Sequence, residues 1–176
     1  MIGEKPTFLR MPTHADAPHL TYESCAEIVV DGLTAAQRSG WFTLHAFAVL
    51  PSAIELVATP LEQDMMTAKE DFQAMTDPML RMLLPEATQI WDQRFVVKWL
   101  DSQRAIDVQF DAMRDQIVLA RPGSDPAVYP FAWLHPRFDA VIYPCFGFES
   151  SPLPWSEHTS TLRMSVHSGK RINKWR

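Results

Sequence analysis

Residues 44–60, LHAFAVLPSAIELVATP, decide the fold of this chain. Two apolar runs meet at Leu50-Pro51-Ser52, where proline and serine are typical of a tight turn. Nearly every position on either side of the turn is apolar, which predicts two strands, 41–50 and 53–60, in the middle of a sheet that is covered on both faces. The other segments are therefore expected to pack around this central hairpin.

The residues before the hairpin are predicted to form a strand, a loop and a helix. Residues 5–11 can form the strand, and prolines and small polar residues mark 11–19 as a loop. Apolar residues then recur at helical spacing from a cap at Thr21 to about Arg38. The loop contains two histidines and an aspartate (His14, Asp16 and His19), but no further ligand cluster lies nearby, so we favour a plain loop over a metal site.

The residues after the hairpin show two helical patterns separated by an extended segment. We expect a helix over 62–75, an interruption at Thr76-Asp77-Pro78, and then a short second helical piece. Asp101 or Ser102 can cap a later helix over 103–119. Its apolar stripe consists of Ile106, Phe110, Met113 and Ile117. A shared face of Phe72, Met75, Met79 and Met82 is interpreted as core packing rather than as an adaptable binding groove.

Composition favours a globular domain with an extension in a reducing compartment. The chain has 176 residues, and 47% of them are hydrophobic, which excludes general disorder. No run approaches the ~18 apolar residues of a membrane span, and the first residues lack a signal-peptide pattern. Cys25 and Cys145 do not form a disulfide framework, so free, packed thiols and a cytoplasmic location are expected. His45, alone among apolar neighbours, is interpreted as a hydrogen-bonded core residue.

Charge is distributed unevenly along the chain. Because five of the 16 basic residues follow Glu157, the last acidic residue, residues 1–157 carry 11 basic side chains against 21 acidic ones, a net charge of −10. Such an acidic body disfavours non-specific nucleic-acid binding. The short basic end suits binding to an anionic surface, such as a membrane, nucleic acid or an acidic protein. The alternative is that it is an ordinary solvated tail.

Three segments resemble the REP-associated type of HUH tyrosine transposase, an IS200-like family. They are Leu50-Pro51-Ser52-Ala53-Ile54-Glu55, Trp91-Asp92-Gln93-Arg94-Phe95 and Tyr129-Pro130. They occur in the family's order, and the resemblance extends over about residues 5–134. It implies an α+β fold, with a ferredoxin-like antiparallel sheet of four or five strands, two or three helices packed on it, and a C-terminal extended tail. The implied domains are 1–135, transposase-like, and 136–176, a Pro- and aromatic-rich extension with a basic end.

The resemblance also implies where the family's active site has been lost. Two histidines of the family hold a catalytic metal at the positions of Ala53 and Glu55 in this chain. A helical tyrosine attacks DNA in the family, but this chain has no tyrosine between Tyr22 and Tyr129, and Phe110 is the aromatic nearest the expected place. We therefore expect no transposase or nuclease activity, no catalytic residue, no metal and no cofactor. Phosphate-binding glycine loops, a nucleophile elbow and paired zinc cysteines are also missing from the sequence.

These expectations favour an inactive, repurposed domain that acts as a structural or accessory subunit of a larger, hetero-oligomeric protein assembly. We expect the protein to be cytoplasmic. In one form of this hypothesis the assembly is membrane-associated, and the protein contacts the cytoplasmic face of the membrane peripherally. The sequence leaves the assembly open. The alternatives are a non-cleaving protein that binds single-stranded DNA hairpins, disfavoured by the net charge of −5, and, more weakly, a new enzyme in the old cleft. Predicted partner-binding residues are Val141, Ile142, Tyr143, Phe146, Phe148, Trp155, Lys170, Arg171, Lys174, Trp175 and Arg176.

Overall fold

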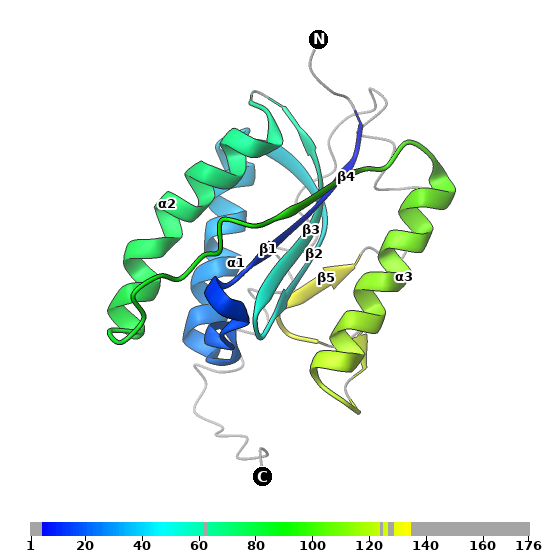
Figure 1. Ribbon diagram of the computed structural model, residues 1–176. Helices are drawn as coiled ribbons and strands as arrows, with labels where there is room; N and C mark the ends of the chain where they lie inside the picture. The colour runs from blue at the N-terminus through cyan, green and yellow to red at the C-terminus, as the bar shows by residue number, and fades with distance from the viewer. Residues whose placement is uncertain (1–4, 62, 124, 127–128, 135–176) are drawn as a thin grey trace, which may run out of the picture.

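The computed structural model describes residues 5–61, 63–123, 125–126 and 129–134 (Figure 1). The elements are β1 (Thr7–Pro12), the 3-10 turns η1 (His14–Asp16) and η2 (His19–Thr21), α1 (Glu23–Arg38), β2 (Phe42–Leu50), β3 (Ala53–Pro60), α2 (Met65–Leu83), β4 (Val96–Trp99), α3 (Gln103–Ala120) and β5 (Ala132–Leu134). The strands at 5–11, 41–50 and 53–60 and the helix at 103–119 are thus confirmed to within about two residues.

The five strands form one antiparallel sheet in the order β4-β1-β3-β2-β5. Within it, β1-α1-β2 and β3-α2-β4 are two split crossover units whose strands interleave, which is the ferredoxin-like arrangement. The strand β5 extends this sheet beyond β2. The predicted α+β fold with a ferredoxin-like antiparallel sheet is therefore confirmed, and the predicted hairpin lies at its centre.

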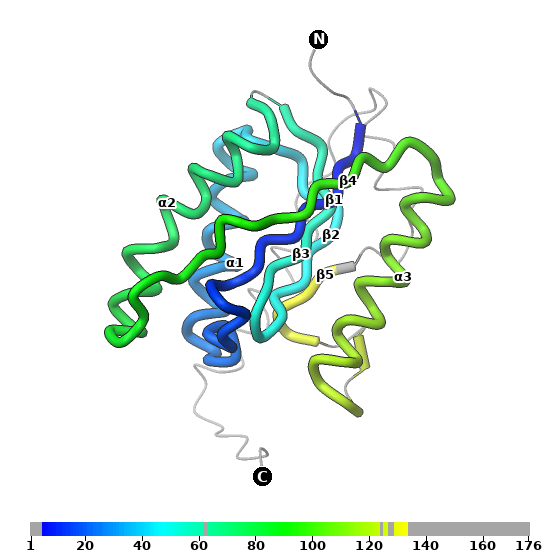
Figure 2. The backbone as a smooth tube through the Cα atoms, viewed as in Figure 1, coloured from blue at the N-terminus to red at the C-terminus, as the bar shows by residue number. Residues whose placement is uncertain are grey.

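Helices cover both faces of the sheet. Figures 1 and 2 show α1 and α2 together on one side and α3 on the other. Alternation along β3 divides its side chains, so that Leu56 packs toward α1 and α2 while Val57 packs toward α3. Burial on both faces explains the nearly continuous apolar sequence of the hairpin.

A β-bulge at His45 lies where the β2–β3 register shifts between Leu44 and Ala46. The His45 side chain is buried, and its Nε2 lies 2.8 Å from Oγ1 of Thr59. The prediction of a hydrogen-bonded core histidine is confirmed. Cys25 is likewise buried, as expected for a packed thiol, and burial raises its pKa.

Two local predictions are wrong. The helix predicted to break at Thr76-Asp77-Pro78 is continuous, because α2 runs from Asp64, whose side chain caps it, through Pro78 to Leu83. Thr76 is fully buried there, and its hydroxyl donates to the Phe72 carbonyl at 2.9 Å, so tertiary packing holds the helix together across the proline. The N-cap of α1 is Tyr22, without a side-chain cap, instead of Thr21.

The methionine face of α2 is core only along its first part. Phe72 is buried and Met75 packs against the core, as predicted. Met79 and Met82 are 40% and 82% exposed, so the core interpretation is wrong for them. The end of this face of α2, at Met79 and Met82, is therefore exposed and is not part of the core that Phe72 and Met75 join.

Several expectations fall on residues outside those described, namely the domain boundary at 135, Cys145 and the whole extension with its partner-binding residues. Among the described residues, no helix combines the length and the apolar composition needed to cross a bilayer.

Candidate functional site

The three residues at the implied former active site lie on the α3 side of the molecule. Ala53, Glu55 and Val57 follow one another at every second position of β3 and so share a face, and Val57 packs in the same cluster as Phe110 of α3. All three are buried, with exposed fractions of 1% for Ala53 and 3% for Glu55 and Phe110. The structure therefore brings them to the face of the sheet that α3 covers, where all three are buried rather than open to solvent.

Glu55 is held by a cross-strand ion pair. The register places it opposite Arg10 of β1, and a nitrogen of the Arg10 guanidinium donates to Glu55 Oε1. The other carboxylate oxygen, Oε2, is buried and has no hydrogen-bond partner among the described residues. Burial raises the pKa of Glu55, while the charge and hydrogen bond of Arg10 oppose this shift. The Glu55 carboxylate thus forms an ion pair with the Arg10 guanidinium.

The aromatic residue on α3 serves as packing. Phe110 belongs to a core with Ile106, Met113 and Ile117, the stripe predicted from sequence. The Ser102 hydroxyl caps this helix by accepting from the Ala105 N–H at 3.2 Å, one of the two predicted alternatives. Helix α3 therefore presents a continuous apolar stripe to the sheet at the place where the sequence resemblance implies the family's nucleophile.

Tyr129, from the third resemblance segment, closes the same core. Its hydroxyl donates to the Val49 carbonyl at 2.8 Å, and its ring meets Phe131 edge-on at 6.2 Å between centroids. Burial raises the pKa of Tyr129, against the opposing charge and hydrogen bond of Arg121. Its hydroxyl is therefore occupied in joining the end of the described chain to the central strand β2.

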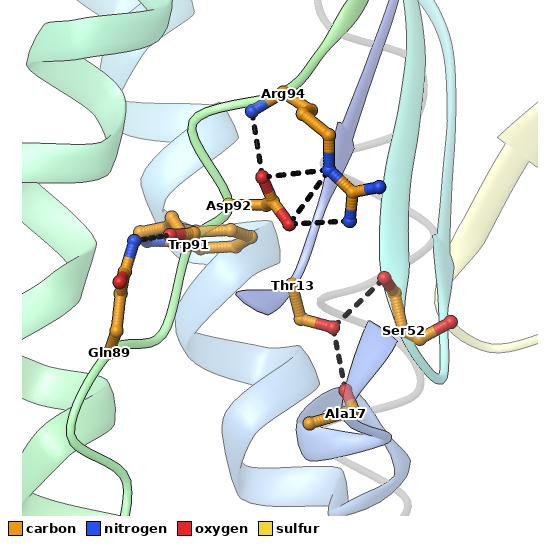
Figure 3. Close-up of polar contacts among 7 residues, drawn as sticks. All are labelled: Thr13, Ala17, Ser52, Gln89, Trp91, Asp92 and Arg94. Carbon is orange, nitrogen blue, oxygen red and sulfur yellow. Dashed lines mark hydrogen bonds and ion pairs between the residues drawn. The ribbon is translucent and has the colours of Figure 1, made fainter. Parts of the chain in front are cut away.

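The polar groups at the hairpin turn fasten the turn to the end of β1. The Thr13 hydroxyl lies 2.6 Å from the Ala17 carbonyl and 3.0 Å from the Ser52 carbonyl (Figure 3). The Leu20 N–H donates to the Pro51 carbonyl at 2.9 Å. His14 and His19 of the neighbouring loop lie in short 3-10 turns. Across the described residues, no three His, Cys, Asp or Glu side chains cluster closely enough to hold a metal ion.

The Trp91–Phe95 segment forms a second polar arrangement, which sequence reasoning used only as a family marker. The Asp92 carboxylate accepts from the Arg94 N–H and pairs with the Arg94 guanidinium at 2.8 Å, as Figure 3 shows. The hydrogen bonds from the Arg94 side chain and backbone hold the pKa of Asp92 well below its usual range. The Asp-x-Arg spacing is the sequence signal for this turn.

Beside this segment lies a groove of about 560 Å³ that the sequence did not predict. One wall is a face of α2 and the other is formed by residues 89–95; the lining residues used below are Lys69, Gln73, Ala74, Pro78, Trp91 and Phe95. The helical spacing of 66, 69, 73 and 77 was a signal for such a wall, but the expected break at Pro78 concealed it.

Comparison with protein-family models and with curated proteins gives no match. Among solved structures, a REP-associated tyrosine transposase bound to a REP hairpin is similar at a TM-score of 0.62 and 15% identity, over 87% of this chain and 91% of that one. A putative transposase from Deinococcus radiodurans is similar at a TM-score of 0.46 and 14% identity, over 63% and 89%. The first similarity shows that this chain has a transposase-like fold. At such low identity it shows the fold alone.

Proposed function

We propose that this protein is a catalytically inactive, transposase-like domain that serves as a structural or accessory subunit of a larger protein assembly. The observation that supports inactivity best is the state of Glu55. A catalytic metal needs several ligands that it can reach, whereas Glu55 is buried with its charge neutralised by Arg10, and Ala53 has no ligand atom.

The nucleophile position supports the same proposal. Cleavage in the related family requires a tyrosine hydroxyl, and the phenyl ring of Phe110 has none. Phe110 is also 3% exposed beneath α3, so DNA would have to displace part of the core to reach it. Metal ligands and nucleophile are replaced together, which would reduce the rate by several orders of magnitude.

The docking role is assigned to the extension at 141–176. Its aromatic residues resemble the apolar centre of an interface, and its basic end would attract an anionic surface, about 1 kcal/mol for each Lys or Arg near lipid headgroups. A membrane-associated assembly on the cytoplasmic side fits both features. A second candidate is a non-cleaving hairpin-DNA binder, which is favoured by the similarity to a transposase solved with a REP hairpin.

The test compares the full chain with a full-length variant in which Lys170, Arg171, Lys174 and Arg176 are changed to glutamate. Each is used for native pull-down from the source cell, divided into membrane and soluble fractions, and for retardation of labelled hairpin DNA. We expect the wild-type chain to be recovered with a defined partner in the membrane fraction and the variant to be released from it.

Three results would separate the candidates. Strong DNA retardation that falls steeply with salt would favour the hairpin-binding alternative. Equal recovery of the partner by the variant would show that the basic end is not the contact. A further full-length variant, Phe146→Ser with Phe148→Ser, then tests the aromatic part, and its failure to reduce recovery would sink the docking proposal.

A further inference from the structure

The groove along α2 has the length of a short extended peptide. Its wall runs from Met66 to Pro78, and twelve helical steps of ~1.5 Å give a length of about 18 Å. Five residues of extended chain, at ~3.3 Å each, cover the same distance. The groove is lined by polar and apolar groups together, and its length suits a strand-like occupant better than a compact molecule.

Lys69 places an unpaired cation in this groove. Its side chain is only 7% exposed, and its Nζ lies 4.7 Å from the centroid of the Phe95 ring. None of the ion pairs among the described residues includes Lys69. A buried charge without a counter-charge lowers stability, and the contact with Phe95 offsets only part of that cost. An arriving carboxylate would supply the missing partner.

Two further donors, both buried atoms of residues that line the groove, lack acceptors. Trp91 is 5% exposed, and its Nε1–H, which can only donate, has no hydrogen-bond partner in the described part of the chain. The same is true of Nε2 of Gln73 on the facing helix. Figure 3 shows that the nearby Gln89 amide is already used, because it donates to the Trp91 carbonyl at 2.8 Å. The free groups of the groove are therefore predominantly donors.

The carboxylates of the groove limit what can bind. Asp77 pairs with Arg81 at 2.5 Å, and Asp92 pairs with Arg94, which leaves Glu70 as an exposed acid beside Lys69 on the helix. A polyanion such as a nucleic-acid backbone would bring further charges close to Glu70, which repels them. A single carboxylate can instead lie next to the Lys69 cation and away from Glu70.

The backbone of α2 adds one acceptor on the same wall. Because Pro78 has no N–H, the Ala74 carbonyl cannot receive its usual helical hydrogen bond. Ala74 and Pro78 both line the groove. A peptide N–H can donate to that carbonyl, so the wall offers a cation and side-chain donors for an acidic side chain and an acceptor for the main chain.

We infer that the groove between α2 and residues 89–95 binds an extended peptide segment of a partner protein, with an acidic side chain placed at Lys69. The groove includes none of the residues of the extension to which the proposed function assigns docking, so either assignment can fail without the other. The main prediction is a preference for Glu over Gln at the central position of the peptide.

The test uses the full chain and two synthetic peptides as probes, acetyl-Ala-Leu-Glu-Leu-Ala-amide and its Gln counterpart. The reporter is the Trp91 indole Nε1–H resonance in a ¹H–¹⁵N spectrum, assigned by its loss in Trp91→Phe. We expect a saturable shift with the Glu peptide and a dissociation constant at least about tenfold higher with the Gln peptide, as a charge-assisted hydrogen bond implies.

Variants then locate the contact. Lys69→Met keeps the side-chain length and should abolish the preference for Glu, while Lys98→Met, an exposed lysine on β4, is the matched control and should keep it. If Lys69→Met does not fold, Gln73→Ala, at a half-buried position of the same wall, should weaken the Glu peptide severalfold.

Three outcomes would overturn the inference. They are the absence of a saturable Trp91 shift, equal affinity for the two peptides, and an unchanged preference for Glu in Lys69→Met or, where Gln73→Ala takes its place, an unchanged affinity for the Glu peptide. Acetyl-glutamate amide is the last probe. If it binds as tightly as the peptide, the occupant is a small carboxylic acid and the peptide assignment is wrong.

Discussion

The α3 side of the sheet and the groove along α2 differ in whether their buried charged groups have a partner of opposite charge. On the α3 side, Glu55 is paired with Arg10 and the Tyr129 hydroxyl is bonded to Val49. In the groove, Lys69 has no ion pair among the described residues, and the Trp91 and Gln73 nitrogens have no acceptor there. The α3 side keeps one buried unpartnered oxygen, Glu55 Oε2, but the carboxylate that carries it has its counter-charge, whereas the Lys69 ammonium has none among the described ion pairs. A paired charge stabilises the fold itself, and an unpaired one marks a region that a ligand can complete.

The largest effect is expected for Phe110→Ala. This change removes a ring that is 3% exposed in the core beneath α3, and it should lower the free energy of unfolding by about 3–5 kcal/mol. Urea denaturation followed by circular dichroism measures it. Leu119→Ala, on the same helix but 71% exposed, is the control and should change stability by no more than about 0.5 kcal/mol. A loss below that level at Phe110 would mean that the site is not packed.

A smaller loss is expected for Tyr129→Phe. The variant keeps the ring but leaves the buried Val49 carbonyl without its 2.8 Å donor, which should cost about 1–2 kcal/mol. Tyr22→Phe, at a tyrosine that is 62% exposed, is the control. Thermal denaturation of the two variants side by side measures the difference, and equal melting temperatures would contradict the hydrogen bond.

Glu55→Gln tests the ion pair through the pH dependence of stability. Burial raises the folded-state pKa of Glu55 above its ordinary value of 4.5, so the folded protein holds this proton more firmly than the unfolded chain. The free energy of unfolding of the wild-type protein, relative to that of the variant, should therefore be highest below pH 4.5. It should fall as the pH rises through the folded-state pKa. Urea denaturation at a series of pH values measures this trend. The opposite slope would show that Arg10 outweighs burial.

The smallest effect on stability is expected in the groove. Lys69→Met removes a buried cation without a described ion-pair partner, so stability should stay within about 0.5 kcal/mol of the wild type or rise. Calorimetric melting of both proteins measures it. A loss of more than about 2 kcal/mol would mean that Lys69 supports the fold as Phe110 does, and the contrast between the two regions would disappear.

The elements with strong local patterns could be predicted from the sequence. The hairpin at 41–60 follows from two apolar runs around Pro51-Ser52, and the stripe of α3 follows from helical spacing. Only the resemblance indicated how the strands are ordered, because strand order depends on contacts between residues far apart in sequence. The similarity to a solved transposase agrees with it.

The contacts of both sites could not be predicted, because they join distant residues. The Arg10–Glu55 pair depends on the β1–β3 register, and the burial of Lys69 depends on Phe95, which lies 26 positions later. Pro78 misled the prediction of α2, since its cost in a helix is offset by the buried Thr76, which sequence alone does not reveal. At Pro78, tertiary packing therefore outweighs the low helix propensity of proline.

The most direct test of the account is a cleavage assay. The full chain is incubated with end-labelled single-stranded hairpin DNA and Mg²⁺ or Mn²⁺, and the products are separated on a denaturing gel beside an active REP-associated tyrosine transposase. Because the proposed function places Ala53, Glu55 and Phe110 at the positions of the family's metal ligands and nucleophile, we predict no cleaved strand and no covalent protein–DNA adduct. An adduct that requires the metal would contradict this prediction and would mean that another side chain supplies the nucleophile.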